Sequence, residues 1–189
     1  TMSEINSTYF SQQNISMAEG FQYVKYFCNN SAGSFNQSEK RYFTIDIPVF
    51  DTILTFSDNF SKGVRFGNIE PNTNNNNAEG NNDTGITSVW AQVNSTDGNA
   101  DVYIKSDTDL TSGSYTIDLS NEKYSFNTTN SSVPSGNKIS LSNSYNILLN
   151  NTGNVTIFLK FFLNVPDSQK GGIYSNNIFL KTVEHGESP

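Results

Sequence analysis

Alternating apolar and polar side chains predict an all-β fold for this chain, a single antiparallel β-sandwich of jelly-roll or immunoglobulin-like type with about nine to eleven strands. The alternation has a period of two residues and recurs along most of the sequence. Turn-forming pairs such as Asp97-Gly98, Ser112-Gly113 and Gly171-Gly172 separate the alternating segments at short intervals. No segment has a convincing helical period, and residues 16–27 fit a helix and a strand equally well.

The strongest predicted strand covers residues 154–165, where every second residue from Val155 to Val165 is apolar. Its other face carries Phe158 and Phe162, so we expect a central strand that is covered on both sides. The asparagine-rich stretch 68–84 reads as a low-complexity loop. The other expected strands, with their inward-facing residues, are 41–50 (Phe43, Ile45, Ile47 and Val49), 86–93 (Val89, Ala91 and Val93), 101–105 (Val102 and Ile104), 115–119 (Tyr115, Ile117 and Leu119), 124–126 (Tyr124 and Phe126), 139–149 (Ile139, Leu141, Tyr145, Ile147 and Leu149) and 173–183.

The length of 189 residues suits one domain with its own hydrophobic core. We expect residues 1–16 to form an N-terminal extension and residues 17–189 to form the β-sandwich domain. Acidic residues outnumber basic ones by 18 to 11, and no basic cluster exceeds the Lys40-Arg41 pair, so nucleic-acid binding is not expected. No apolar run is long enough to cross a bilayer, so we expect no direct membrane insertion.

Eleven Asn-X-Ser/Thr sequons indicate a secreted protein that carries covalent N-glycans. Chance would give roughly six sequons in a chain so rich in Asn, Ser and Thr. The chain opens with Thr1-Met2, which fits the removal of a signal peptide. The predicted glycosylation sites are Asn6, Asn14, Asn29, Asn36, Asn59, Asn82, Asn94, Asn127, Asn130, Asn150 and Asn154. Those beside turns are expected to be occupied, whereas Asn154 at the start of a strand is expected to be skipped.

The sequence offers no pattern typical of an active site, so we expect no enzymatic activity, no cofactor and no metal. The sole histidine, His185, lies in a polar tail, and we do not expect it to form a dyad with the lone cysteine, Cys28. Two alternatives stay open. Lys160 lies between two Phe residues and could form an isopeptide bond, although a lysine stem on a half-covered strand is the simpler interpretation. Five acidic residues could bind calcium, although Asp is also an ordinary turn former: Asp83, Asp97, Asp101, Asp107 and Asp109.

Two stretches resemble segments of secreted archaeal β-sandwich proteins. The first is Gly63-Val-Arg-Phe-Gly-Asn-Ile-Glu-Pro-Asn-Thr-Asn, followed by Ala78-Glu-Gly-Asn-Asn82. The second is Asn164-Val-Pro-Asp-Ser-Gln-Lys-Gly-Gly-Ile-Tyr-Ser-Asn-Asn-Ile178, which is similar to the closing strands of such proteins. Within that group the chain is most similar to the non-type-IV filament subunits of archaea, of the thread and bundling-pilus kind, in its size, its sequon content and its expected lack of a membrane anchor.

The resemblance implies a structural subunit of an extracellular surface filament with a role in adhesion or biofilm. Subunits of this kind form a homopolymer by donor-strand complementation, in which a terminal strand of one subunit completes the sandwich of the next. We expect residues 1–16 to be that strand, with Ile5, Tyr9 and Ile15 as anchors. An ordinary first strand of the chain's own sheet, or donation from the carboxyl end, are the alternatives.

The competing function is a cell-surface adhesive or glycan-binding module. Trp90 and exposed tyrosines are the kind of side chains that stack on sugars, although a single Trp within a strand is more often part of a core.

Overall fold

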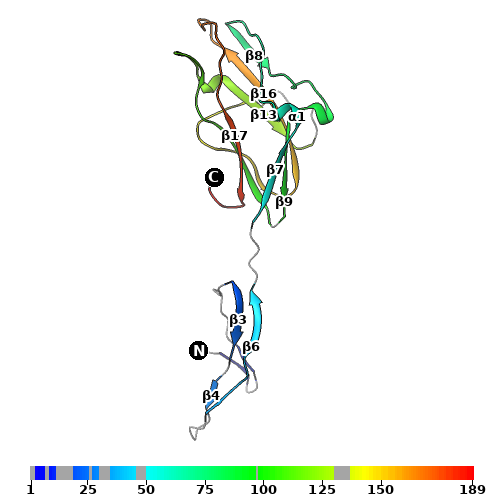
Figure 1. Ribbon diagram of the computed structural model, residues 1–189, viewed down its shortest axis with the longest axis vertical. Coiled ribbons are helices and arrows are strands. Elements are labelled where there is room, and N and C mark those ends of the chain that lie inside the picture. Colours follow the sequence, from blue (N-terminus) through cyan, green and yellow to red (C-terminus); the bar gives the residue numbers. More distant parts are fainter. Residues whose placement is uncertain are drawn as a thin grey trace. The chain divides into compact units, whose positions relative to one another are not determined.

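The computed structural model describes residues 3–6, 9–11, 19–25, 27–29, 35–45, 50–96, 98–129 and 137–189, and this part of the chain consists mainly of antiparallel strands. The predicted all-β fold class is therefore confirmed. Helical structure in these residues is confined to α1 (Asp58–Ser61) and to two 3-10 turns, η1 (Gly85–Thr87) and η2 (Leu119–Asn121). The chain separates into two compact units, Thr1–Val49 and Phe50–Pro189, whereas the sequence analysis expected one domain that follows a short extension (Figure 1).

The described residues of the first unit form three two-stranded antiparallel sheets. The pairs are β1 (Ser3–Asn6) with β2 (Tyr9–Ser11), β3 (Gly20–Val24) with β6 (Arg41–Ile45), and β4 (Phe27–Asn29) with β5 (Phe35–Gln37). The ambiguous segment 16–27 thus contains strands. None of the side chains described in this unit is buried. The described side chains therefore give this unit no core of its own. Isolated two-stranded sheets are marginally stable at best in water.

The larger sheet of the second unit is built around β16 (Val155–Val165), the strand with the strongest alternation. The strand order is β14-β13-β16-β9-β7, and β8 also pairs with β16. The expectation that residues 154–165 form a central strand is confirmed. The remaining bounds are β7 (Thr52–Phe56), β8 (Thr73–Asn77), β9 (Trp90–Ser95), β13 (Glu122–Asn127) and β14 (Ile139–Ser140).

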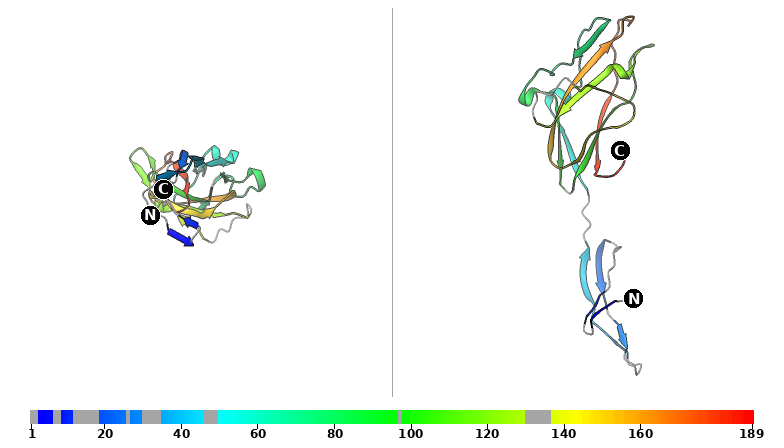
Figure 2. Two further views of the ribbon diagram at one scale, coloured as in Figure 1. Left: turned by 90° about the horizontal axis from the view of Figure 1, so that it is seen from below. Right: turned by 180° about the vertical axis from the view of Figure 1, so that it is seen from behind.

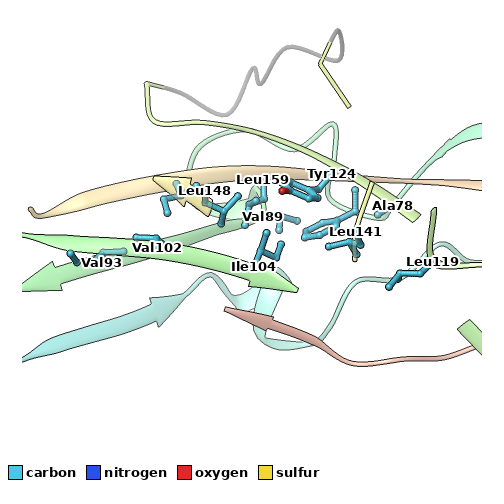
Figure 3. Close-up of a cluster of buried hydrophobic side chains, with 13 residues drawn as sticks. Ala78, Val89, Val93, Val102, Ile104, Leu119, Tyr124, Leu141, Leu148 and Leu159 are labelled. Atoms are coloured by element: carbon cyan, nitrogen blue, oxygen red, sulfur yellow. The ribbon is translucent and has the colours of Figure 1, made fainter. Parts of the chain in front are cut away.

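A smaller three-stranded sheet shares its core with the larger one. It has the order β15-β10-β17, with β10 (Ala100–Ser106), β15 (Asn146–Thr152) and β17 (Ile178–Glu184); Figure 2 shows these strands from further directions. Val102 and Ile104 of β10 belong to the same buried cluster as Tyr124 and Leu159 of the larger sheet (Figure 3). Two sheets that bury their apolar faces against one core are what a β-sandwich requires. A separate hairpin pairs β11 (Leu110–Ser112) with β12 (Tyr115–Ile117).

The asparagine-rich stretch 68–84 is not simply a loop, because it contains β8. Asn72 and Asn75 adopt positive φ angles of 58° and 56°, which asparagine tolerates better than most residues. Further along, the side chain of Asn81 takes the place of a strand beside β16. Its amide nitrogen donates to Phe161 O at 2.7 Å, and its amide oxygen accepts from Phe161 N at 3.0 Å. The Asn81 side chain therefore continues the hydrogen bonding along β16, between the part that pairs with β8 and the part that pairs with β9.

The predicted strand 139–149 is two strands, β14 and β15, and part of its inward face is assigned wrongly. Leu148 is buried, whereas Ile147 is 48% exposed and Ile139 is 41% exposed. The register between β10 and β15 shifts around Val102, and such a shift exchanges the residues that face the core. Tyr115 was also expected to face inward but is 48% exposed. The inward face of residues 89–93 is confirmed, because Val89, Ala91 and Val93 are buried.

Candidate functional site

A cavity of about 670 Å³ lies in the second unit between residues 63–71 and residues 169–178. Its floor is formed by buried apolar side chains from β11, β12 and the end of β16, and Phe66, Ile69 and Tyr174 pack against them. We call this cavity the groove. Its floor residues are Leu110, Ile117, Leu163 and Val165. The two stretches with the family resemblance supply its walls.

Glycine and proline explain why the walls are not regular strands. Gly63 and Gly67 have φ angles of +86° and +64°, which favour glycine. Pro166 follows β16 directly, and a proline cannot donate a ladder hydrogen bond. On the other wall, a Cβ atom at Gly172 would clash with Ser112, so the chain passes close to β11 there. Residues 63–71 and 169–174 therefore run beside the floor outside the regular strands.

The backbone of both walls is largely unpaired. Residues 66–69 and 171–173 form no hydrogen bond with any other described residue. Ser175, by contrast, exchanges two backbone hydrogen bonds with Thr111, at 3.0 and 3.1 Å. At the rim, Ile173 is 91% exposed, which is unusual for a large apolar side chain. The groove thus combines an apolar floor with unused backbone donors and acceptors.

Glu122 is a buried acidic residue that lines the groove. Its side chain is 1% exposed, and its Oε2 atom accepts a hydrogen bond from Asn176 Nδ2 at 2.7 Å. Burial raises the pKa of the Glu122 carboxyl, and the nearby Asp107 charge raises the pKa further, while the Asn176 hydrogen bond opposes the shift. The sequence analysis did not find this residue. A signal was present, because Glu122 shares the inward phase of Tyr124 and Phe126.

The acidic turn residues act as hydrogen-bond acceptors. Asp107 accepts from Asn177 N at 2.9 Å, from Asn177 Nδ2 at 2.7 Å and from Thr108 N at 2.8 Å, and these bonds lower the pKa of its carboxyl. Asp109 accepts from Leu119 N at 2.9 Å. Within the described ranges, no three His, Cys, Asp or Glu residues are grouped as metal ligands would be, and Asp97 lies outside those ranges. The arrangement favours the interpretation as turn formers.

His185 and Cys28, which the sequence analysis did not expect to form a dyad, lie in different units of the chain. His185 lies 2.9 Å from Asp101, between Nδ1 and Oδ1. Asp101 also accepts from the backbone of Asn151 and Gly186, and the Asn151 bond is the largest cause of a lowered Asp101 pKa. The hydrogen bonds of Asp101 with His185 and Gly186 stabilise the turn after β17. Cys28 lies in β4, where side chains are outside the described set. The absence of enzymatic activity stays a prediction.

The sequon asparagines differ in accessibility. Asn82, Asn150 and Asn154 are exposed, whereas Asn94 and Asn127 are half-buried. Asn154 accepts a hydrogen bond from Ser95 N through its side-chain oxygen, at 2.8 Å, and its expected lack of a glycan stays a prediction. The backbones of three further sequon residues lie in strands of the first unit, and two residues fall outside the described ranges. The residues in strands are Asn6, Asn29 and Asn36, and the residues outside the described ranges are Asn14 and Asn130.

The amide nitrogen of the sequon residue Asn59 is already engaged in hydrogen bonds. This nitrogen is the atom to which an N-glycan attaches. It donates to Asp83 Oδ2 at 3.1 Å and to the backbone oxygen of Thr87. Asn59 also lies inside α1 and is half-buried. The fold therefore hides this site, which sequence inspection could not show.

The predicted donor segment and the candidate sugar-stacking residues are only partly described. Ile5 lies in β1 and Tyr9 in β2, which pair with each other, and Ile15 falls outside the described residues. Trp90 is half-buried in β9. Lys160 lies in β16 opposite Ser125. The three anchor assignments stay predictions.

A second exposed feature is aromatic and belongs to the first unit. Phe21, Tyr23 and Tyr42 lie on one face of the β3–β6 pair and are 71%, 55% and 57% exposed. The rings of Phe21 and Tyr42 stack at 5.1 Å, and Lys40 Nζ lies 4.3 Å from the centre of the Tyr23 ring. Such a face offers stacking surfaces to a sugar or to another protein.

Within the part of the chain that the structure describes, no helix is long and apolar enough to span a membrane. Comparison of the chain with protein-family models, with curated proteins and with solved structures found no match. The resemblance to archaeal filament subunits therefore stays a prediction from the sequence.

Proposed function

We propose that the chain is a structural subunit of an extracellular, N-glycosylated surface filament of the non-type-IV pilus or thread kind. Subunits join head-to-tail by donor-strand complementation, and the filament serves adhesion or biofilm formation. A contact between two different surfaces of the same chain is heterologous, and repeated contacts of this kind produce an open filament.

The groove is the observation that carries the proposal. Its walls at residues 66–69 and 171–173 have unused backbone groups, and its floor is apolar. A strand from another copy would form hydrogen bonds with those groups and would cover the floor at the same time.

The first unit supports the proposal from the donor side. In the part of this unit that the structure describes, strands pair only in twos and no side chain is buried. The sequence predicts residues 1–16 as the donor, with Ile5, Tyr9 and Ile15 as anchors. The exposed sequons at Asn82 and Asn150 support glycans on the second unit, where they would discourage lateral pairing of sheets.

Electron microscopy of the purified full chain tests the proposal directly. We expect long fibres, and discrete particles at every protein concentration would contradict it. Deletion of residues 1–16 should leave a soluble protein that does not elongate, and the added 1–16 peptide should cap growing fibres of the full chain. Deletion of residues 187–189, an exposed tail, is the control and should leave elongation unchanged.

The exposed aromatic face favours a second candidate function, a glycan-binding or adhesive module. Phe21, Tyr23 and Tyr42 would provide the stacking surfaces. Glycan-array binding by discrete particles, lost in Tyr42→Ala and kept in the control Tyr115→Ala, would favour this function over the filament. Tyr115 is similarly exposed but lies in the second unit.

A further inference from the structure

We propose that the groove receives strand β6 of a second copy of the chain, with the guanidinium group of that copy's Arg41 paired to the carboxylate of Glu122. The inference rests on the proposed function, because it names the strand and the charged contact that fill the acceptor groove. It differs from the sequence-based assignment, which makes residues 1–16 the donor.

Glu122 requires a cation that its own surroundings do not provide. The carboxylate is almost completely buried, and its side-chain partner is the neutral amide of Asn176. Arg65 and Lys170 also line the groove, but both are exposed and neither forms an ion pair with Glu122 among the described residues. A buried carboxylate is costly unless it is paired and hydrogen-bonded, so an incoming cation would be favoured at this position.

The groove therefore selects an extended segment of a particular pattern. The unpaired wall residues require a strand, because a strand offers backbone donors and acceptors at regular intervals. The floor of Leu110, Ile117, Leu163 and Val165 requires apolar side chains on the same face of that strand. Glu122 requires one basic side chain among them.

The first unit contains only three basic residues, Lys25, Lys40 and Arg41, and residues 1–16 contain none. Of the three, only Arg41 lies in a strand. Alternate residues of a strand face the same side, so Arg41 shares its face with Phe43 and Ile45. This is one cation followed by two apolar side chains, which matches the groove.

β6 is also available for a new strand contact. Among the described residues its only neighbour is β3, so its second edge is unpaired. Arg41 is exposed, and Phe43 is 37% exposed. The planar guanidinium can donate two hydrogen bonds to one carboxylate, which lysine cannot do in the same geometry. Lys40 points to the other face, where its Nζ lies over the Tyr23 ring, and therefore serves as a matched control.

Charge substitutions in the full chain test the pair. Arg41→Ala and Glu122→Gln should each raise the concentration at which filaments form by about tenfold or more, as expected for loss of a buried interfacial charge pair. The double variant should be little worse than either single variant. Lys40→Ala should change this concentration by less than about threefold. Equal effects of Lys40→Ala and Arg41→Ala would overturn the inference.

Cross-linking distinguishes the two donor assignments even if a charge variant folds poorly. In a Cys28→Ser background, one variant carries Phe43→Cys with Ile173→Cys, and the other carries Ile5→Cys with Ile173→Cys. A short bismaleimide should convert filaments of the first variant into covalent ladders. Ladders only with the Ile5 variant would overturn the inference but leave the proposed filament standing. If the unmodified chain forms no filament at any concentration, both fail.

Discussion

At the scale of single residues, strand β13 buries polar side chains of two kinds, with and without a hydrogen-bond partner among the described residues. Glu122 accepts from Asn176, whereas the Tyr124 hydroxyl and the Ser125 hydroxyl have no hydrogen-bond partner among the described residues. Unpaired buried hydroxyls cost free energy because they lose water on folding and gain nothing in return. The same strand thus carries a hydrogen-bonded carboxyl group that faces the groove and two buried hydroxyls without a partner among the described residues.

The Tyr124→Phe substitution is expected to stabilise the second unit. It removes a fully buried hydroxyl without a partner and keeps the ring, so the free energy of unfolding should rise by about 1 kcal/mol. Urea denaturation followed through the single tryptophan, Trp90, measures this change in the second unit. The half-buried Tyr103→Phe is the control and should stay within about 0.5 kcal/mol of the parent. A less stable Tyr124→Phe variant would show that the hydroxyl has a partner.

Glu122 predicts a pH dependence of stability in the unassembled chain. Its folded-state pKa is raised, chiefly by burial, so the folded state holds a proton that the unfolded state has already lost. Stability should therefore fall as pH rises from the ordinary glutamate pKa of about 4.3 through the raised folded value. Glu122→Gln lacks this loss, so it should match the parent near pH 4 and exceed it at pH 7. A constant difference between the two proteins across this range would contradict the assignment.

At the scale of elements, the sequence predicted strands with a strong apolar alternation. It did not predict pairing in which a side chain forms the hydrogen bonds that a strand backbone usually forms. The pattern of residues 154–165 predicted β16 and its central place. β8 was missed because its five residues are almost all asparagine and carry no apolar alternation. Its existence depends on pairing with β16 and on Asn81, whose amide binds the Phe161 backbone. Such pairing is a tertiary effect, and local propensity does not contain it.

The position of Asn59 within the short helix α1 predicts that the sequons differ in glycan occupancy. Asn59 should be unmodified in native material, because its amide nitrogen donates to Asp83 and to the Thr87 carbonyl, whereas the exposed Asn82 and Asn150 should carry glycans. Glycopeptide mass spectrometry measures the occupancy of each site. Asp83→Ala is the informative variant, since it removes one of the two acceptors and keeps the Asn82 sequon intact; occupancy at Asn59 should rise. Full occupancy of Asn59 in the parent chain would contradict this prediction.

At the scale of the whole molecule, the sequence predicted the fold class, and the structure divides the chain into two units, Thr1–Val49 and Phe50–Pro189. The division follows from burial: the described side chains of Thr1–Val49 include none that is buried, whereas Phe50–Pro189 holds both apolar clusters. The groove walls could be predicted only through a family resemblance, since unpaired backbone has no sequence signature. Glu122 was recoverable in principle, because a charged residue in the inward phase of a strand is a rare pattern.

Limited proteolysis of the unassembled chain should therefore cut within Thr1–Val49 long before it cuts within Phe50–Pro189. Cleavage requires local opening, and segments with few buried side chains open at the lowest free energy. Mass spectrometry should identify a resistant fragment that begins near Phe50. In assembled filaments the same sites should be protected, because the donated strand lies against the groove of a neighbour. The Arg41→Ala variant, kept at a concentration where it does not assemble, is the control and should be cut like the unassembled parent. Equal cleavage of filaments and unassembled chain would mean that the first unit takes no part in the contact between copies.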